Sequence, residues 1–140
     1  MRKTALTIAL FATAAFTYAN AATVAYKANL TAASEVPPVQ SQGKGSATVN
    51  VDTATKQATY RVEFSGLSGP AAAAHIHCGA AAGANAGVAV PLGGANPTSP
   101  ISGQATMTEA QLADLQAGKC YVNVHTAANK GGEIRGQLAP

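Results

Sequence analysis

The sequence is poor in charged and in aromatic side chains. Only 11% of its 140 residues are charged and 5% are aromatic, whereas 47% are hydrophobic. This composition excludes a disordered acidic or basic tail and predicts a chain that folds. At this length, one domain is the expectation.

Long apolar runs are also missing beyond the N-terminus, and no other segment approaches the roughly 20 residues that a membrane helix needs. Near the N-terminus two basic residues precede an apolar stretch from Ala5 to Phe16, and Ala19-Asn20-Ala21 has the form of a cleavage site. We therefore predict a signal peptide over residues 1–21. The mature chain, residues 22–140, is predicted to be exported, either periplasmic or secreted, with no membrane attachment after cleavage.

The mature chain has little excess of charge of either sign. Without Arg2 and Lys3 the formal charge of +3 falls to +1, and the remaining lysines and arginines form no cluster in the sequence. An electrostatic footprint for nucleic acid or anionic lipid is therefore absent from the sequence, and neither is predicted as a partner.

Cysteine is scarce, with Cys78 and Cys120 as the only two. In an exported chain an even number of cysteines most simply forms a disulfide, whereas the same pair in the cytosol would more often be free thiols. We therefore predict one disulfide, Cys78–Cys120, with a structural role.

The dominant pattern in the rest of the chain is an alternation of apolar and polar residues, which is typical of half-buried antiparallel strands. Thr108-Glu109-Ala110-Gln111 has the capping-box form, and Leu112 and Leu115 follow at helical spacing, which predicts one short helix. Glycine and proline punctuate the strands, which favours an all-β Greek-key sandwich or barrel over a parallel sheet. Eight strands are predicted, at 23–30, 45–51, 58–64, 72–77, 87–92, 101–107, 119–126 and 133–138.

The three histidines are the most informative residues. His75 and His77 are one residue apart on a predicted strand, so both side chains leave the same face, about 7 Å apart. His125 shares a face of a second strand with Tyr121 and Asn123. The cysteine of each strand occupies an even-numbered position and the histidines occupy odd-numbered ones, so their side chains leave opposite faces of the strand. A disulfide on one face of the sheet therefore places all three imidazoles on the other.

Three neutral imidazoles that converge from neighbouring strands suit a copper ion, with zinc as the alternative, because these ions favour nitrogen ligands. We predict one ion bound by His75, His77 and His125, with a fourth position for water or substrate. An ion near 2.0 Å from each ligand requires the three nitrogens to lie within about 4 Å of one another. The alternative interpretation is three separate surface or hydrogen-bonded histidines without a metal.

Several ordered motifs lie along the mature chain: Glu35-Val36-Pro37-Pro38-Val39, Gly43, Gly45-Ser46-Ala47, Ala74-His75-Ile76-His77-Cys78-Gly79, the stretch 115–126 and Gly132-Glu133-Ile134-Arg135-Gly136-Gln137. They resemble the CHRD domain, which is named for chordin and is found singly in many exported bacterial proteins. Together these motifs cover essentially all of the mature chain, which is therefore expected to be one CHRD domain, residues 22–140. The resemblance implies little about biochemistry, because CHRD domains have no settled molecular activity.

The order of the histidine segments is also similar to that of the copper ligands in Cu/Zn superoxide dismutase, a Greek-key β-sandwich. This resemblance implies a superoxide-dismutase-like or immunoglobulin-like sandwich, with His75, His77 and His125 as copper ligands. It also implies that Arg135 guides the superoxide anion, although an arginine on a strand more often pairs with an acidic residue, here Glu133 or Glu63. No histidine lies between His77 and His125. The bridging ligand and the zinc site therefore have no counterpart, and a mononuclear site is implied.

Other polar residues have structural and functional interpretations. Glu133 either orients an imidazole or is a solvated carboxylate at the sheet edge. Tyr121 and Asn123 either line the histidine site or pack against it. Glu35 is predicted to be an element of loop structure and not an acid catalyst, and the stretch 80–87 has little to bury, which predicts a mobile loop.

Two classes of function follow from these residues. The first is an exported protein that binds a single copper ion. Its more specific version adds superoxide-dismutase-like redox activity at that ion. The second is a non-catalytic extracellular interaction module without a metal, which binds an extracellular protein or polymer through its sandwich surface. A three-histidine zinc hydrolase is a third alternative, which requires zinc with an open coordination position.

Overall fold

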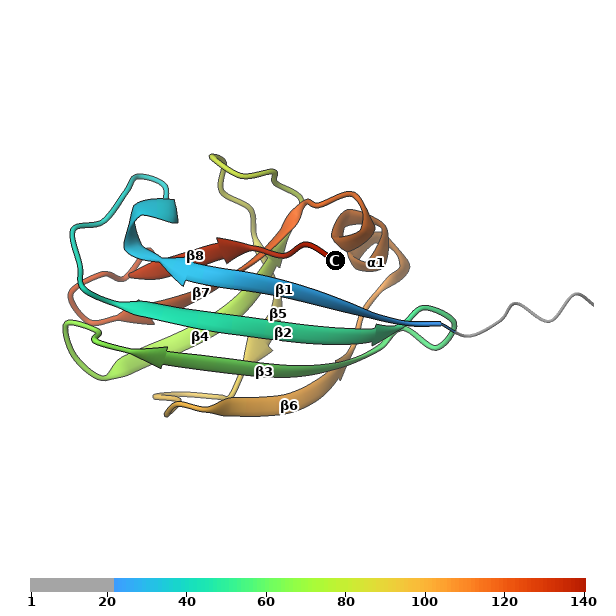
Figure 1. Cartoon of the computed structure of the whole chain (residues 1–140), viewed down its shortest axis with the longest axis horizontal. Coiled ribbons are helices and arrows are strands. Elements are labelled where there is room, and N and C mark those ends of the chain that lie inside the picture. Colours follow the sequence, from blue (N-terminus) through green and yellow to red (C-terminus); the bar gives the residue numbers. More distant parts are fainter. Residues whose placement is uncertain (1–21) are drawn as a thin grey trace, which may run out of the picture.

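A computed structural model describes residues 22–140, which form eight strands, one α-helix and a short 3-10 helix (Figure 1). The predicted signal peptide, residues 1–21, lies outside the described residues. The elements are β1 (Thr23–Thr31), η1 (Ala32–Ser34), β2 (Lys44–Asp52), β3 (Gln57–Ser65), β4 (Ala71–Cys78), β5 (Val88–Leu92), β6 (Ile101–Thr106), α1 (Glu109–Gln116), β7 (Cys120–Thr126) and β8 (Ile134–Gln137).

All eight strands belong to one antiparallel sheet with the order β5-β4-β7-β8-β1-β2-β3-β6. The sheet curves round so that the terminal strands β5 and β6 come into contact, which nearly closes a barrel (Figure 1). The connections from β3 to β4 and from β6 to β7 cross between the two halves of the sheet, as in Greek-key folds. The predicted all-β Greek-key architecture is confirmed, and every predicted strand is present.

The interior is filled by the apolar residues of the alternating pattern. On β2, Val49 and Val51 are fully buried, and Val62 on β3 is buried opposite Ala47. The register of β2 against β1 and β3 is uninterrupted over these positions. Since successive side chains point to opposite faces of a strand, this regular register places one apolar set inward along the whole of β1, β2 and β3.

Helix α1 begins where the capping box predicts. The Thr108 hydroxyl accepts from the backbone N–H of Gln111, and the Gln111 side chain accepts from the backbone N–H of Thr108. Leu112 and Leu115 are buried against the core. The chain leaves the helix through Gly118, whose φ of 72° favours glycine, and enters β7. The helix thereby connects β6 to the strand that carries His125.

Strands β4 and β7 are joined covalently at one end. Cys78 and Cys120 are register partners and form a disulfide, as predicted. Cys120 shares the core-facing side of β7 with Val122 and Val124, which are fully buried. The histidines have the other parity and lie on the opposite face of the same two strands, so the predicted division between disulfide and imidazoles is confirmed.

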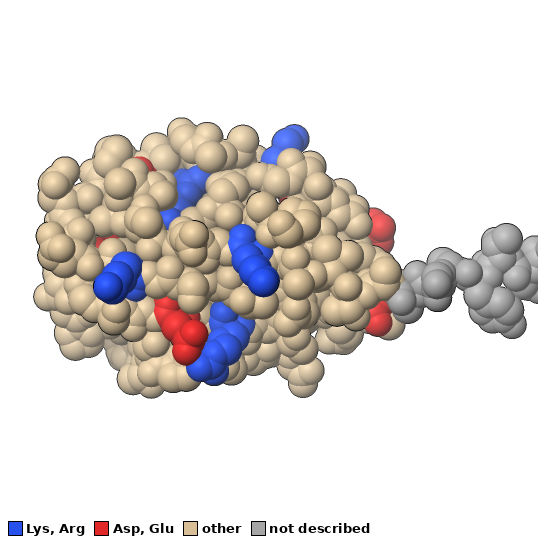
Figure 2. All heavy atoms as spheres, viewed as in Figure 1, with Lys and Arg blue, Asp and Glu red and all other residues tan. Residues whose placement is uncertain are grey.

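Charged side chains are dispersed over the molecule. Figure 2 shows the lysines and arginines of one face spread among uncharged residues, with an acidic side chain between two of them. Arg61 pairs with Glu63 at 2.6 Å, so the predicted alternative pair of Arg135 with Glu63 is wrong. Among residues 22–140, no helix is long and apolar enough to cross a membrane.

Candidate metal site

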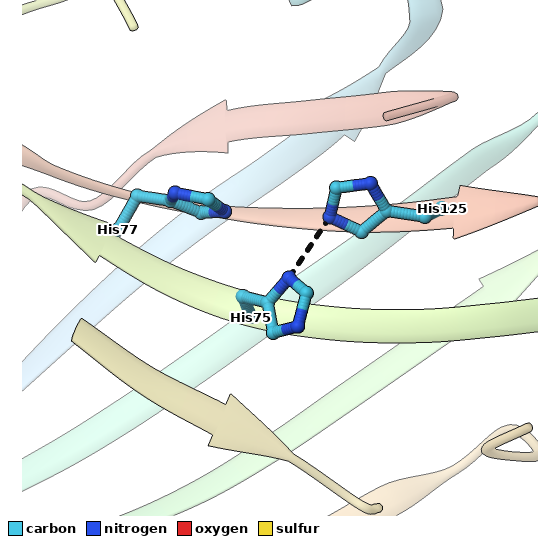
Figure 3. Close-up of side chains that lie close together, drawn as sticks. All are labelled: His75, His77 and His125. Atoms are coloured by element: carbon cyan, nitrogen blue, oxygen red, sulfur yellow. Dashed lines mark hydrogen bonds between the residues drawn. The ribbon is translucent and has the colours of Figure 1, made fainter. Parts of the chain in front are cut away.

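His75 and His77 from β4 and His125 from β7 turn their rings toward a common space (Figure 3). One ring nitrogen from each histidine lies within 4.8 Å of the other two. The closest pair is His75 Nδ1 and His125 Nε2, at 2.9 Å. This pair meets the predicted spacing, and the widest pair exceeds it by less than about 1 Å, a distance that small side-chain rotations can span.

The register of β4 against β7 brings the three rings together. His75 is opposite Asn123, His77 is opposite Tyr121, and His125 is opposite Ala73. Because an alanine carries only a methyl group, His125 meets no bulky cross-strand partner and reaches diagonally toward His75. The cluster therefore depends on the small residue opposite His125 as well as on the His-x-His spacing.

Two backbone carbonyls fix the orientation of two of the rings. His77 Nδ1 lies 2.8 Å from the Ala86 carbonyl oxygen, and His125 Nδ1 lies 2.9 Å from that of Lys130. A carbonyl oxygen only accepts, so each neutral ring carries its proton on Nδ1 and has a lone pair on Nε2. Metal-binding histidines are commonly oriented in this way. Nothing in the sequence identified these two carbonyls, because they come from the loops 79–87 and 127–133.

Burial keeps two of the imidazoles in the neutral form. The pKa of His75 is lowered by burial and, to a smaller extent, by the neighbouring His125 and His77. The pKa of His125 is lowered by burial, against the hydrogen bond to Lys130, and further by His77. Near pH 7 both rings are therefore uncharged, which leaves lone pairs that protons do not occupy.

Tyr121 and Arg135 support His77 from the side. The rings of His77 and Tyr121 are stacked, with centroids 4.7 Å apart and planes inclined by 2°. The Arg135 guanidinium lies 3.5 Å from the Tyr121 ring centroid. Since β7 runs between β4 and β8, the tyrosine ring is sandwiched between the imidazole and the guanidinium. This stack restricts rotation of His77.

Arg135 is 1% exposed and is bonded to the loop 79–87. It donates from Nη1 to Asn85 Oδ1 at 3.0 Å and from Nη2 to the Ala84 carbonyl at 2.7 Å. The predicted pair with Glu133 is therefore wrong. The loop, which offers few side chains to bury, is held through its polar groups. The anion-steering role of Arg135 stays a prediction, and it requires the loop to uncover the guanidinium.

Asn123 and Glu35 lie next to His77. Asn123 Oδ1 is 3.1 Å from His77 Nε2, and Asn123 Nδ2 donates to the Gly131 carbonyl at 3.4 Å. Glu35 is 4% exposed, and burial raises its pKa to about 7 against the opposing effects of Arg135, Asn123 and the Val36 backbone. The parity of Asn123 with His125 identified the asparagine as a candidate lining residue. For Glu35 the sequence held no such signal.

Glu133 has neither of its predicted roles. Its side chain is fully buried and accepts hydrogen bonds from the hydroxyls of Ser41, Ser68 and Thr126, at 2.5 to 2.6 Å, and from the Asn129 amide at 3.1 Å. Burial alone would raise its pKa, but the bonds from Ser41, Ser68 and Thr126 lower the pKa to about 2. Glu133 therefore ties together three loops next to the histidine cluster.

A nearly closed antiparallel barrel with three histidines gathered on its outer face defines a small all-β domain with a candidate metal site. The family model of the CHRD domain matches residues 26–138, so the chain belongs to the CHRD domain family. No curated protein and no solved structure gave a significant match. The likeness to Cu/Zn superoxide dismutase stays a prediction from the order of the histidine segments.

Proposed function

We propose that this CHRD-domain protein is exported and binds a single copper ion through His75, His77 and His125, with zinc as the alternative ion. The observation that supports the proposal best is the convergence of the three ring nitrogens within 4.8 Å. Copper(II) is the divalent ion of its series that nitrogen sites bind most tightly, because affinity rises along the series to copper and then falls at zinc.

The hydrogen bonds around the cluster also support binding. With Nδ1 of His125 bonded to Lys130, the 2.9 Å contact between the two rings requires His75 Nδ1 to donate to His125 Nε2. An ion at this place replaces that single shared proton, and His75 carries its proton on Nε2 instead. The remaining donors keep their bonds to carbonyl oxygens, so the cost of reorganising the site is small.

Export is supported by the disulfide and by the family. A disulfide persists in the periplasm or outside the cell and is rare in the cytosol. The family resemblance and the signal-like N-terminus agree with this compartment. The choice between periplasm and secretion does not affect the metal proposal.

Metal loading tests the proposal directly. The purified protein is incubated with Cu(II) or with Zn(II), freed of unbound metal by gel filtration and analysed by mass spectrometry. We expect about one copper ion per chain in the wild type and little in His77→Ala, because two nitrogens no longer complete a site. His75→Ala should give the same loss, and its partly exposed position makes it the better tolerated variant.

Gln104→Ala on the exposed side of β6 is the control and should retain the full copper content. Melting temperatures measured on all variants separate loss of a ligand from loss of the fold. A wild type as empty of copper and zinc as both histidine variants contradicts the proposal, and it leaves the interaction module as the better account of the domain.

The more specific part of the proposal is that the bound copper gives the protein superoxide-dismutase-like activity. The copper-loaded wild type should consume superoxide faster than the metal-free protein, and Arg135→Ala should reduce this rate while retaining copper. Such a loss with retained metal supports anion steering, since a nearby cation raises the local concentration of an anionic substrate. An unchanged rate in Arg135→Ala assigns the arginine to holding the loop 79–87.

A further inference from the structure

The side chain of Asn123 lies on the same sheet face as the three histidines and contacts His77. Asn123 is the cross-strand partner of His75 and lies two residues from His125 on the same face of β7. Its side-chain oxygen is 3.1 Å from His77 Nε2, and the residue is 2% exposed. A buried polar group at this position contacts His77, shares the sheet face of the other two proposed ligands and is shielded from solvent.

The contact between Asn123 and His77 joins two acceptors when the imidazole is neutral. His77 Nδ1 uses its proton on the Ala86 carbonyl, so Nε2 presents a lone pair. The oxygen Oδ1 of Asn123 also presents lone pairs. Two acceptors at 3.1 Å repel each other unless a cation, either a proton or a metal ion, lies between them.

Contacts on the side of Asn123 away from His77 fix the orientation of its amide. Its Nδ2 donates to the Gly131 carbonyl, and the buried carboxyl of Glu35 lies beside the same nitrogen. A methyl group added at Gly132 would collide with both the Glu35 carboxyl and Asn123 Nδ2, so these groups are tightly packed. Turning the amide over would set Oδ1 against the Gly131 carbonyl, which only accepts.

We propose that Asn123 provides a fourth ligand, its side-chain oxygen, and that the site is a tetragonal site of three nitrogens and one oxygen for Cu(II), with Glu35 as a positioning residue. This inference rests on the copper site proposed above. Neighbouring ligands at right angles, each about 2.0 Å from an ion, are about 2.8 Å apart, whereas tetrahedral ligands are about 3.3 Å apart. The spacing of 2.9 Å between His75 and His125 is close to the square arrangement, which Cu(II) prefers, and the spacing of 3.1 Å between His77 and Asn123 lies between the two arrangements.

Substitution of Asn123 combined with spectroscopy tests this ligand. Asn123→Leu keeps the size of the side chain and removes the oxygen, and Asn123→Asp keeps an oxygen in the same place. Copper affinity is measured by competition with a chelator. Asn123→Leu should bind Cu(II) about tenfold to a hundredfold more weakly, as expected when a supporting ligand is removed, whereas Asn123→Asp should bind at least as tightly as the wild type.

A second measurement identifies the oxygen atom. Electron-nuclear double resonance in 17O-labelled water should show no equatorial water on Cu(II) in the wild type and one such water in Asn123→Leu, because water fills the vacated position. Asn50→Leu, the same change on β2 away from the cluster, is the control and should behave as the wild type. Glu35→Gln should give a mixture of both signals, since its amide no longer fixes the orientation of Asn123.

The outcomes separate this inference from the proposed function. If the wild type binds no copper, the copper site and its fourth ligand are both overturned. If the wild type binds copper with an equatorial water, and Asn123→Leu binds within twofold of the wild type, the histidine site stands and the Asn123 ligand is overturned. If Asn123→Leu does not fold, Asn123→Asp decides: a folded aspartate variant with weakened copper binding contradicts an oxygen ligand at this position.

Discussion

Replacing Glu133 by glutamine should lower the free energy of unfolding by about 3 kcal/mol more at pH 7 than at pH 2. The buried carboxylate accepts bonds from Ser41, Ser68, Thr126 and Asn129. Burial raises its pKa, but the bonds from Ser41, Ser68 and Thr126 lower the pKa to about 2. A glutamine has one acceptor oxygen in place of two and turns an N–H₂ group toward hydroxyls that already donate. Removing the charge therefore leaves several buried donors without an acceptor.

The pH dependence follows from the depressed pKa. The folded state holds the Glu133 carboxylate to about pH 2, whereas the unfolded chain takes up the proton near its ordinary value of 4.5. The stabilisation is therefore present in full above about pH 5 and is lost as the pH falls from there to about 2. Urea unfolding of the wild type and Glu133→Gln at several pH values measures this convergence.

Glu63→Gln is the matched control. Its carboxylate pairs with Arg61 on the surface, with both side chains 54% exposed, so its loss should change stability by less than about 1 kcal/mol. A constant difference between wild type and Glu133→Gln from pH 7 to pH 2 is incompatible with an ionised, hydrogen-bonded Glu133.

Removing the disulfide should have a comparable effect. The double variant Cys78→Ala and Cys120→Ala should lose about 4 kcal/mol of unfolding free energy, because the bond closes a loop between residues 42 positions apart and restricts the unfolded chain. Cys120 is fully buried, so the smaller alanine also leaves space in the core. Guanidinium unfolding with and without reductant measures the loss.

Reductant is the internal control for this prediction. The wild type should unfold at lower denaturant concentration when it is reduced, whereas the double variant should be insensitive to reductant. Equal midpoints for oxidised and reduced wild type would mean that the bond adds nothing to stability. The copper content of the double variant should remain high if the fold persists, since neither cysteine faces the histidines.

The barrel could be predicted from the sequence because its signals are local. A period of two along β2 and β3 places Val49, Val51 and Val62 inward, and the Thr108 to Gln111 capping box marks the start of α1. The same parity argument predicted the disulfide on one face of β4 and β7 and the histidines on the other. Each of these inferences needs only the neighbours of a residue along the chain.

The surroundings of the histidines could not be predicted in this way, because they depend on loops that fold back over the sheet. Alternation indicates that Arg135 and Glu133 face away from the core, and a single sheet face of this kind is normally solvated. In the structure the loops 35–41, 79–87 and 127–133 cover that face and bury both residues. Glu35 and the carbonyls of Ala86 and Lys130 reach the cluster through contacts between distant segments.

The position of the histidine strands in the sheet order has a consequence for how the domain opens. Fraying starts where pairing is weakest, at the seam where β5 and β6 meet with few contacts. Neither β4 nor β7 borders that seam, and their shared end is covalently closed. Local opening of the barrel at that seam therefore leaves the three imidazoles in register.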